Sequence, residues 1–204
     1  LIRMAELALE AGLPAGVLNV VTGEGAVVGE TLGLSMDVDV LVFTGSGATG
    51  RRLMEYAARS NMKRVYLELG GKSPYIVFDD ADLDSAVEGL VDAIWFNQGQ
   101  VCCAGSRLLV HEPVADLFYA KLRARMDKLR IGSPLDKSID VGAIVDPKQL
   151  ASITTLVAAN TAGTTHVAPC DLPVEGSFYP PTLITGLHPA DTLMQEEIFG
   201  PVLV

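Results

Sequence analysis

The first 69 residues alternate between helical and strand patterns, and this alternation limits the possible folds more than any other feature. Apolar residues recur at helical spacing over residues 1–11, and Gly12 and Pro14 end that helix. Further strands are expected at 16–21, 38–43 and 64–69, and further helices at 25–34 and 51–59. This order predicts an α/β fold with a doubly wound parallel sheet. The stretch at 38–43 is almost continuously apolar, which is typical of a parallel strand buried on both faces.

The second part of the chain continues the mixture of helices and strands. Helices are expected at 80–97, 114–130 and 146–163, the last with Pro147 near its start and Gly163 past its end. Strands are expected at 75–78, 107–112, 178–186 and 200–204. The stretch GGKSP at 70–74 combines two glycines with a proline, which predicts a break between domains. We therefore expect domains at 1–70 and 71–204.

Composition limits the class of partner and the compartment. The chain of 204 residues is 49% hydrophobic and carries 15 Lys and Arg against 25 Asp and Glu, a net charge of −10. This charge balance offers no basic face for a phosphate backbone, so a nucleic acid partner is not expected. The odd count of 3 cysteines, without a signal peptide or a membrane-spanning apolar stretch, favours free thiols in the cytoplasm.

The two ends of the chain fall inside secondary-structure patterns. The sequence opens on LIRMAELALE, which is helical and has no initiator methionine, and it closes on FGPVLV, which is strand-like. Domains rarely begin and end in this way. We therefore expect the chain to be an internal piece of a longer protein.

The turn FTGSGATGR at 43–51 is a candidate phosphate site. It follows an expected strand and opens an expected helix, so backbone N–H groups at the helix start could face an anion. The spacing of Gly45, Gly47 and Gly50 differs from that of the usual dinucleotide fingerprint. A tight connection that merely needs glycines explains the same pattern equally well.

Glu68 is the first candidate catalytic residue. It lies between Leu67 and Leu69 in an expected strand that runs into two glycines. A carboxylate that is desolvated there has a raised pKa, which a general base near neutrality needs. The alternative is a strand with one wet face, on which Tyr66 and Glu68 both lie outside.

The adjacent thiols Cys102 and Cys103 form the second candidate site. Their spacing does not suit a C-x-x-C redox pair or a zinc site, and no metal site is expected. Backbone amides of the surrounding small-residue loop could lower a thiol pKa and bind an oxyanion. Two buried, inert cysteines are the alternative. A cysteine hydrolase would need a histidine beside the thiol, and His111, His166 and His188 stand in no recognisable motif.

Two of these stretches resemble signature segments of a known family. VYLELGGKSP at 65–74 and FNQGQVCCAGSRLLV at 96–110 look like those of the NAD(P)-dependent aldehyde dehydrogenase superfamily. PAGVLNVVTGEG, FTGSGATGR, SFYPPTLITG and QEEIFGPVLV match its recurring segments in its order. The resemblance covers essentially the whole chain. The residues of these motifs are similar to those of bacterial members of family sixteen. It implies the second half of a Rossmann-like cofactor domain, followed by an α/β catalytic domain that is incomplete at its C-terminal end.

The resemblance also implies roles for individual residues. It makes Cys102 the nucleophile and Glu68 the general base. Cofactor contacts with NAD, or with NADP, are implied for Gly25, Gly29, Gly45, Ser46, Leu69, Glu197 and Phe199. A substrate pocket that favours an apolar aldehyde is implied for Phe96, Val101 and Cys103.

The implied reaction is oxidation of an aldehyde to a carboxylic acid through a cysteine thiohemiacetal and a thioester. The oxyanion-hole asparagine and the cofactor lysine of the family both precede residue 1, and the oligomerisation strand follows residue 204. The resemblance implies a homo-oligomer for the longer protein. The alternatives are a CoA-acylating semialdehyde dehydrogenase, whose members typically lack the base, and a catalytically silent module used for structure or binding.

Overall fold

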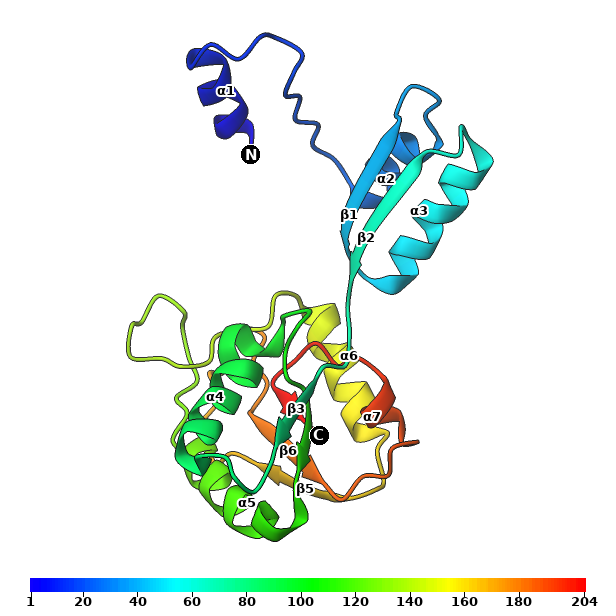
Figure 1. The fold of residues 1–204 in the computed structure, drawn as a ribbon. Coiled ribbons are helices and arrows are strands. Elements are labelled where there is room, and N and C mark those ends of the chain that lie inside the picture. Colours follow the sequence, from blue (N-terminus) through cyan, green and yellow to red (C-terminus); the bar gives the residue numbers. More distant parts are fainter. The chain divides into compact units, whose positions relative to one another are not determined.

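The computed structural model describes the whole chain, Leu1–Val204. Its contacts divide the chain into two compact units, Leu1–Leu69 and Gly70–Val204, and each unit combines helices with strands (Figure 1). None of the helices combines the length and the apolar character that a membrane crossing requires.

The first unit contains a parallel pair of strands joined by a helix. Its elements are α1 (Ile2–Glu10), α2 (Gly25–Leu34), β1 (Val40–Gly45), α3 (Gly47–Arg59) and β2 (Arg64–Leu69). β1 and β2 pair in parallel from Val40 opposite Arg64 to Gly45 opposite Leu69, and α3 packs against both strands (Figure 1). The expected alternation of helix and strand is therefore confirmed from residue 25 to residue 69.

The strand expected at 16–21 is wrong. These residues form turns and irregular backbone, and no other strand lies beside them. Gly16 has a positive φ of 90° and its carbonyl oxygen accepts a hydrogen bond from the Asn19 side chain, which turns the chain. Val17 and Val21 stay exposed, so this apolar run covers no core. A strand needs a partner for its backbone groups, and the pattern alone does not supply one.

The expectation that the 38–43 stretch is buried on both faces is also wrong. In β1, Val42 is 72% exposed, whereas its neighbours Leu41 and Phe43 are half-buried. β2 alternates in the same way, with Tyr66 and Glu68 on the exposed side. Such alternation shows that one face of the pair is covered and the other is open.

The second unit is built around two ladders of strands. Its elements are β3 (Pro74–Val77), α4 (Leu83–Trp95), the short 3₁₀ helix η1 (Phe96–Gly99), β4 (Arg107–Val110), α5 (Glu112–Met126), α6 (Pro147–Ala158), β5 (Thr164–Val167), β6 (Thr182–Thr185), α7 (Thr192–Gln195) and β7 (Val202–Leu203). The strands and helices expected from the sequence are present; β3 is shifted by one residue, and the others are shorter than their patterns. β5, η1 and α7 are additional to those expectations.

The two ladders adjoin through the end of the chain. β3 pairs in parallel with β4, while β6 pairs in parallel with β7 and antiparallel with β5. Val204, directly after β7, accepts a hydrogen bond from Leu108 N–H and donates one to the carbonyl oxygen of Ser106. The strands therefore follow one another in the order β3, β4, β7, β6, β5.

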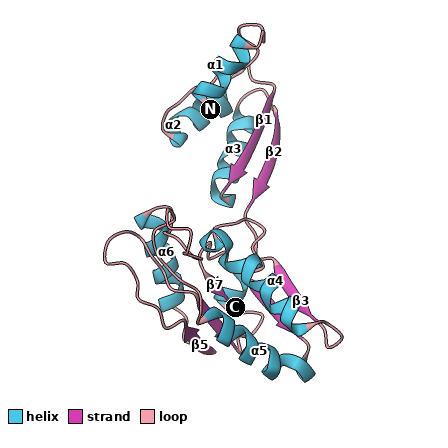
Figure 2. Cartoon of the chain, turned by 90° about the vertical axis from the view of Figure 1, so that its left-hand side faces the viewer, coloured by secondary structure: helices cyan, strands magenta, loops and turns pink.

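Two apolar clusters form the core of the second unit. The larger one packs α4 and α5, which lie side by side in Figure 2, around the fully buried Trp95, Phe118 and Leu122. The smaller one lies beneath α6 and includes Ile153, Ile184 and Val202. Together they hold β4, β7 and the segment between α4 and β4 in fixed positions.

Helix starts follow the capping residues that the sequence provides. The Asp82 side chain accepts hydrogen bonds from the N–H groups of Asp84 and Ser85 and caps α4. The Asp146 side chain caps α6 in the same way, with Pro147 as its first residue. Side-chain oxygens at these positions satisfy N–H groups that the first helical turn leaves free.

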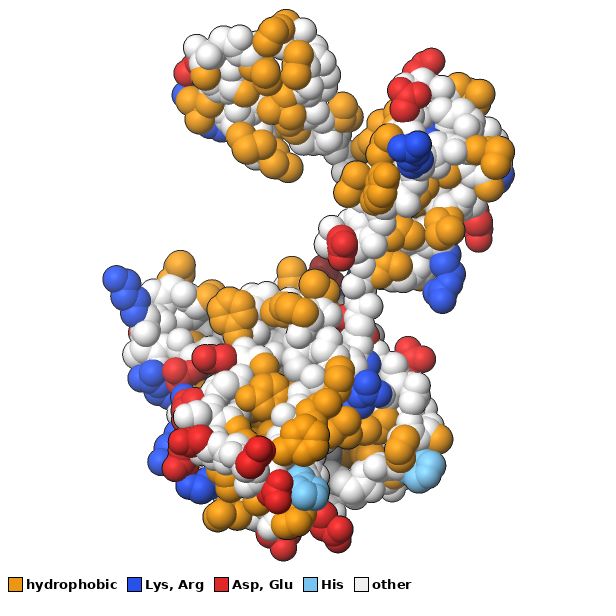
Figure 3. All heavy atoms as spheres, in the orientation of Figure 1, with side chains coloured by type: hydrophobic (Ala, Val, Ile, Leu, Met, Phe, Trp, Pro, Cys, Tyr) orange, Lys and Arg blue, Asp and Glu red, His pale blue; other side chains and the backbone are white.

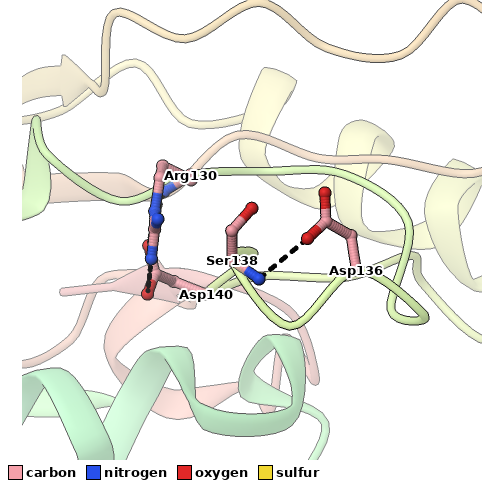
Figure 4. A network of polar contacts seen from close by, with 4 residues as sticks. All are labelled: Arg130, Asp136, Ser138 and Asp140. Atoms are coloured by element: carbon pink, nitrogen blue, oxygen red, sulfur yellow. Dashed lines mark hydrogen bonds and ion pairs between the residues drawn. The ribbon is translucent and has the colours of Figure 1, made fainter.

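A polar loop between α5 and α6 is closed by an ion pair. Arg130 donates from Nε and Nη2 to the carboxylate of Asp140, at 3.0 and 3.2 Å, and Asp136 accepts from Ser138 N–H (Figure 4). The Arg130 hydrogen bond holds the pKa of Asp140 below its ordinary value. Closing this loop directs the chain toward residues 142–145, which lie beside the segment that carries the two thiols.

Candidate active site

The adjacent thiols lie on an exposed loop between η1 and β4. Cys102, Cys103 and Cys170 are all free, and the first two are exposed, which confirms the prediction of free thiols. The loop is anchored by hydrogen bonds from Gly105 N–H to Ala93 and from Ala104 N–H to Val101. A side chain at Gly105 would press against Ala93 and Tyr75, so the small residues after the thiols are required by packing.

The backbone before the thiols is strained. Asn97, Gln98 and Gly99 are consecutive and all left-handed, with φ values of 48°, 59° and 69°. Non-glycine residues in this region cost on the order of 1–3 kcal/mol each and persist only where the surroundings fix them. Here the Asn97 side chain donates to the carbonyl oxygen of Gln100, whose own N–H returns to Asn97. Strain concentrated in this way is typical of a functional loop.

A second segment, distant in sequence, crosses this loop. A Cβ on Gly99 would collide with the backbone carbonyl of Gly200. The backbones of the two segments therefore pass each other with no side chain between them. Nearby, the buried Trp95 Nε1 donates to the carbonyl oxygen of Pro201 at 3.2 Å. The structure thus brings the QEEIFGP segment directly against the loop of Cys102.

Glu197 and Phe199, two of the expected cofactor residues, lie on this crossing segment. The exposed Glu197 carboxylate accepts a hydrogen bond from the backbone N–H of Gly71 at 3.1 Å. Phe199 is left-handed, with φ of 54°, and its carbonyl oxygen accepts from the side chain of Gln149. The sequence shows no sign of this role for Gln149, because its partners are 49 and 50 residues away.

A cavity of about 330 Å³ opens beside the loop. Its lining consists of Asn97, Gln98, Gln100, Ala143, Val145 and Phe199. Gln100 helps to form it, because its Oε1 accepts a hydrogen bond from Val145 N–H at 3.1 Å. The cavity is concave and mixed in polarity, which suits a small organic ligand.

All three of the expected pocket residues lie outside that lining. Phe96 is 70% exposed and Val101 is half-buried against the larger apolar cluster. Cys103 is exposed beside Cys102. Their assignment to a substrate pocket remains a prediction.

Lys72 is a half-buried lysine with a buried amine, and the sequence interpretation missed it. Burial, and to a smaller extent the charge of Arg107, lowers the pKa of Lys72, Glu197 acts in the opposite direction, and the resulting pKa is about 8. Its Nζ is buried without a hydrogen-bond partner, and so is Nε of Arg107. Since most lysines are exposed, a lysine after two glycines gives no sequence signal of burial.

Glu68 lies in the first unit, near the end of β2. Its side chain is exposed on the open face of the pair with Tyr66, so the wet-face alternative is the one observed and the expected burial is wrong. Opposite it in β1 stands Thr44. The carboxylate therefore has free access to water on this face.

The glycine-rich turn has the expected form of strand, turn and helix. Ser46 is the N-cap of α3 and its Oγ accepts from Thr49 N–H at 3.3 Å. Gly45 and Ser46 are both exposed, and Leu69, the partner of Gly45 in β2, is half-buried. Free N–H groups at the start of such a helix favour an anion.

Gly25 and Gly29 line a cavity of about 580 Å³ in the first unit, together with Arg52, Tyr56 and residues of β1. A Cβ at either glycine would meet no other atom within 4 Å, so both face open space. The cavity is large enough for a flat aromatic ligand.

The third cysteine, Cys170, is not part of this site, and the site contains no metal-binding cluster. Cys170 is half-buried, and burial, with a smaller effect of Asp171, raises the pKa of its thiol. No group of three or more His, Cys, Asp or Glu side chains is placed to hold a metal ion. The exposed thiols are Cys102 and Cys103.

Comparison with known proteins places these segments in a family. The model of the aldehyde dehydrogenase family matches residues 1–204. The chain is 47% identical over 199 residues to aldehyde dehydrogenase family 2 member B4, mitochondrial, of Arabidopsis thaliana, covering 97% of this chain and 37% of that relative.

Solved structures agree with this relationship. The aldehyde dehydrogenase KauB of Pseudomonas aeruginosa matches with a TM-score of 0.93 at 47% identity, covering 99% of this chain and 42% of that one. An NAD-dependent aldehyde dehydrogenase of Sinorhizobium meliloti matches with a TM-score of 0.94 at 43% identity, covering 99% of this chain and 40% of that one. The chain thus spans about two fifths of the length of these relatives. The family match over the whole chain and the likeness to these relatives show that the chain belongs to the aldehyde dehydrogenase family.

Proposed function

We propose that the protein carrying this chain oxidises an aldehyde to a carboxylic acid with NAD⁺ as cofactor, and that NADP⁺ is the alternative cofactor. The observation that carries the proposal is the exposed Cys102 thiol, which follows a strained loop crossed by the segment of Glu197 and Phe199. The names of the relatives support aldehyde oxidation, and that of the Sinorhizobium protein supports NAD.

The residues present fit a dinucleotide. The cavity beside Gly25 and Gly29 has open space at both glycines and would take the adenosine half. The start of α3 at Ser46, next to Gly45, offers N–H groups for the pyrophosphate. Glu197 would hold the nicotinamide ribose, while Phe199 and Leu69 would pack beside the ring.

Cys102 begins the reaction. Its thiolate attacks the aldehyde carbon, the C=O bond becomes a C–O⁻ group, and the Cys102 backbone N–H stabilises that oxyanion. When bound, the cofactor accepts the hydride that leaves this carbon, and a thioester to Cys102 remains. Cys103 stays beside the reacting carbon as a neighbour.

Glu68 completes the reaction. Its carboxylate takes a proton from water, the resulting hydroxide adds to the thioester carbon, and the C–S bond breaks to release the carboxylic acid and the Cys102 thiolate. Access of Glu68 to water on the open face of β2 supports this role.

The two units divide the work. We assign residues 1–70 to the cofactor domain and residues 71–204 to the domain of the nucleophile. The protein is a cytoplasmic homo-oligomer, and Phe96, Val101 and Cys103 favour an apolar aldehyde. The free state of all three cysteines supports a reducing compartment.

The test is an assay of NADH formation by the protein that carries this chain. A panel of aliphatic and aromatic aldehydes is supplied with NAD⁺ or NADP⁺, and Cys102→Ser serves as the matched blank. Wild-type turnover that is absent in Cys102→Ser supports the proposal. Tight NAD⁺ binding without turnover on any aldehyde would instead indicate a binding module.

A further inference from the structure

Gln149 is a side chain that joins helix α6 to the segment of Glu197 and Phe199. Its Nε2 donates hydrogen bonds to the carbonyl oxygens of Ile198 and Phe199, each at 3.1 Å and partly buried. Gln149 stands in the first turn of α6, which Asp146 caps and Pro147 begins. The backbone that carries the Gln149 amide is therefore held in place by the capped first turn of α6.

The carbonyl groups that Gln149 binds belong to a strained turn. Phe199 is left-handed, a conformation that a bulky residue holds only when its neighbours fix it. Gly200 follows, and a Cβ there would meet the Ile153 side chain of the same helix, which leaves no room for the turn to relax toward α6. On its other side Gly200 meets Gly99, so the turn is held between α6 and the loop of Cys102.

The other bonds of this turn do not replace Gln149. The Glu197 carboxylate is bound to Gly71, and the Pro201 carbonyl is bound to Trp95. Neither bond touches the peptide groups of Ile198 and Phe199. Loss of the Gln149 donors would leave two partly buried carbonyls without these bonds and would release the backbone between them.

We propose that Gln149 is a positioning residue that clamps the Glu197–Gly200 turn against the loop of Cys102 and so couples cofactor binding at the turn to the reactivity of the thiol. The proposal rests on the proposed function only in naming the cofactor. Its physical basis is the Gly99–Gly200 crossing, since a shift of either backbone displaces the other. Coupling of this kind is reciprocal, so a cofactor that steadies the turn also steadies the thiol loop.

The experiment measures the alkylation rate of Cys102 by iodoacetamide, with and without NAD⁺, in the protein that carries this chain. Fragmentation of the alkylated peptide by tandem mass spectrometry separates Cys102 from the adjacent Cys103, Cys170 lies on another peptide, and NAD⁺ affinity is measured in parallel. Gln149→Met keeps the side-chain length and removes the donors, while Gln149→Glu keeps the shape and places oxygens against the two carbonyls. Asn160→Ala is the matched control, because it removes a side-chain amide bond to Ala162 just after the other end of α6.

In Gln149→Met we expect NAD⁺ affinity to fall by roughly 5- to 100-fold, the combined worth of two hydrogen bonds. Cys102 alkylation without NAD⁺ should slow, because a looser loop orients fewer amides toward the thiolate. The ratio of rates with and without NAD⁺ should move toward one. Gln149→Glu should exceed these effects, and Asn160→Ala should match the wild type.

Three results would overturn the proposal. The first is a wild-type alkylation rate in Gln149→Met without NAD⁺, even if affinity falls, because Gln149 would then contact the cofactor without positioning the loop. The second is a lower melting temperature with an unchanged ratio of rates, which a purely structural role predicts. The third is a wild-type protein whose alkylation ignores bound NAD⁺. Absence of aldehyde turnover with all the expected alkylation results would reject the proposed function and leave the clamp intact.

Discussion

The carboxylate of Glu197 accepts a hydrogen bond from the backbone N–H of Gly71, 126 residues earlier in the chain. This bond fastens the turn that carries Glu197 and Phe199 to the link that precedes β3. Lys72 is the next residue, and it feels the charges of both Glu197 and Arg107. Gly71 therefore offers a backbone donor, and Lys72 a buried amine, to the segment of Glu197.

The first prediction concerns the pH dependence of stability at Lys72. Its pKa is lowered from 10.5 to about 8 in the folded chain, so the unfolded chain binds more protons between these values. Where the unfolded chain binds more protons, the free energy of unfolding rises with pH. The wild type should therefore gain stability relative to Lys72→Met as the pH rises through this window. We expect a gain of about 2 kcal/mol, after allowance for partial exposure. Urea unfolding of both variants across this pH range measures it.

The exposed Lys128 provides the matched control for this experiment. Lys128→Met should keep a constant difference from the wild type, because it removes a side chain that is exposed in the folded chain. All groups other than the substituted lysine are common to the variants, so their contributions cancel in the difference. A flat difference for Lys72→Met would show that the amine reaches water in solution.

The second prediction separates the two thiols. In the protein that carries this chain, Cys102→Ser should abolish aldehyde oxidation, while Cys103→Ser should keep much of it. Only one sulfur can stand under the carbonyl, and the resemblance assigns that place to Cys102. Steady-state NADH formation at matched folded yield measures both variants. Equal losses would reject the assignment.

The third prediction concerns Glu68. Glu68→Gln should slow turnover by roughly 10²–10⁴-fold, the usual worth of a positioned general base. A stoichiometric burst of NADH should survive, because the base acts on the thioester after hydride has left. Rapid mixing followed by steady-state rates separates the two phases. Unchanged turnover would remove Glu68 from the mechanism.

The fourth prediction concerns the ion pair in Figure 4. Asp140→Asn should lower the melting temperature of the second unit by roughly 1–4 °C, as expected for a single exposed but two-pronged ion pair. The pKa of Asp140 is lowered by Arg130, so the benefit is present above the ordinary value of 3.8 and is lost as the pH falls through the lowered value. Thermal melts at neutral and acidic pH test this.

The control for this prediction is Glu175→Gln, at an exposed site with no ion pair, which should change neither melt. An equal drop in both variants would trace the effect to net charge.

The fifth prediction concerns residues 1–204 alone. We expect no aldehyde oxidation from this chain, although Cys102 and Glu68 are both present. The resemblance implies that the oxyanion asparagine of the family is not among these residues, and one missing donor typically costs roughly 10²–10³ in rate. NADH formation by the purified chain with several aldehydes is the measurement. Turnover within about tenfold of an ordinary enzyme would contradict this expectation.

The sequence predicted correctly those elements whose ends are marked by residues next to them. Both α2 and β2 match their expected ranges, because glycines and the small polar residues near them mark their ends. The expected strand at 16–21 failed and β5 was missed for the same reason. A valine-rich run does not guarantee a partner strand, whereas the polar β5 becomes a strand only by pairing with β6.

The site was predicted to the extent that its chemistry lies in contiguous motifs. Cys102 and Glu197 stand in such motifs, and the structure brings their segments together at Gly99 and Gly200. Gln149 and Lys72 could not be found in this way. Their importance depends on partners far along the chain and on burial, and neither property leaves a local pattern.

The uneven distribution of buried side chains has a consequence for hydrogen exchange. In the first unit the buried apolar side chains are Leu53 and Ala57, whereas two extensive clusters fill the second. α1 buries none of its residues and presents apolar side chains at its surface (Figure 3). Amides in α1, β1 and β2 should therefore exchange with deuterium by local opening, well before those of α4 and α5. The glycine-rich turn then belongs to the most readily opened part of the chain, and a ligand bound there would be detected first as slower exchange in β1 and α3.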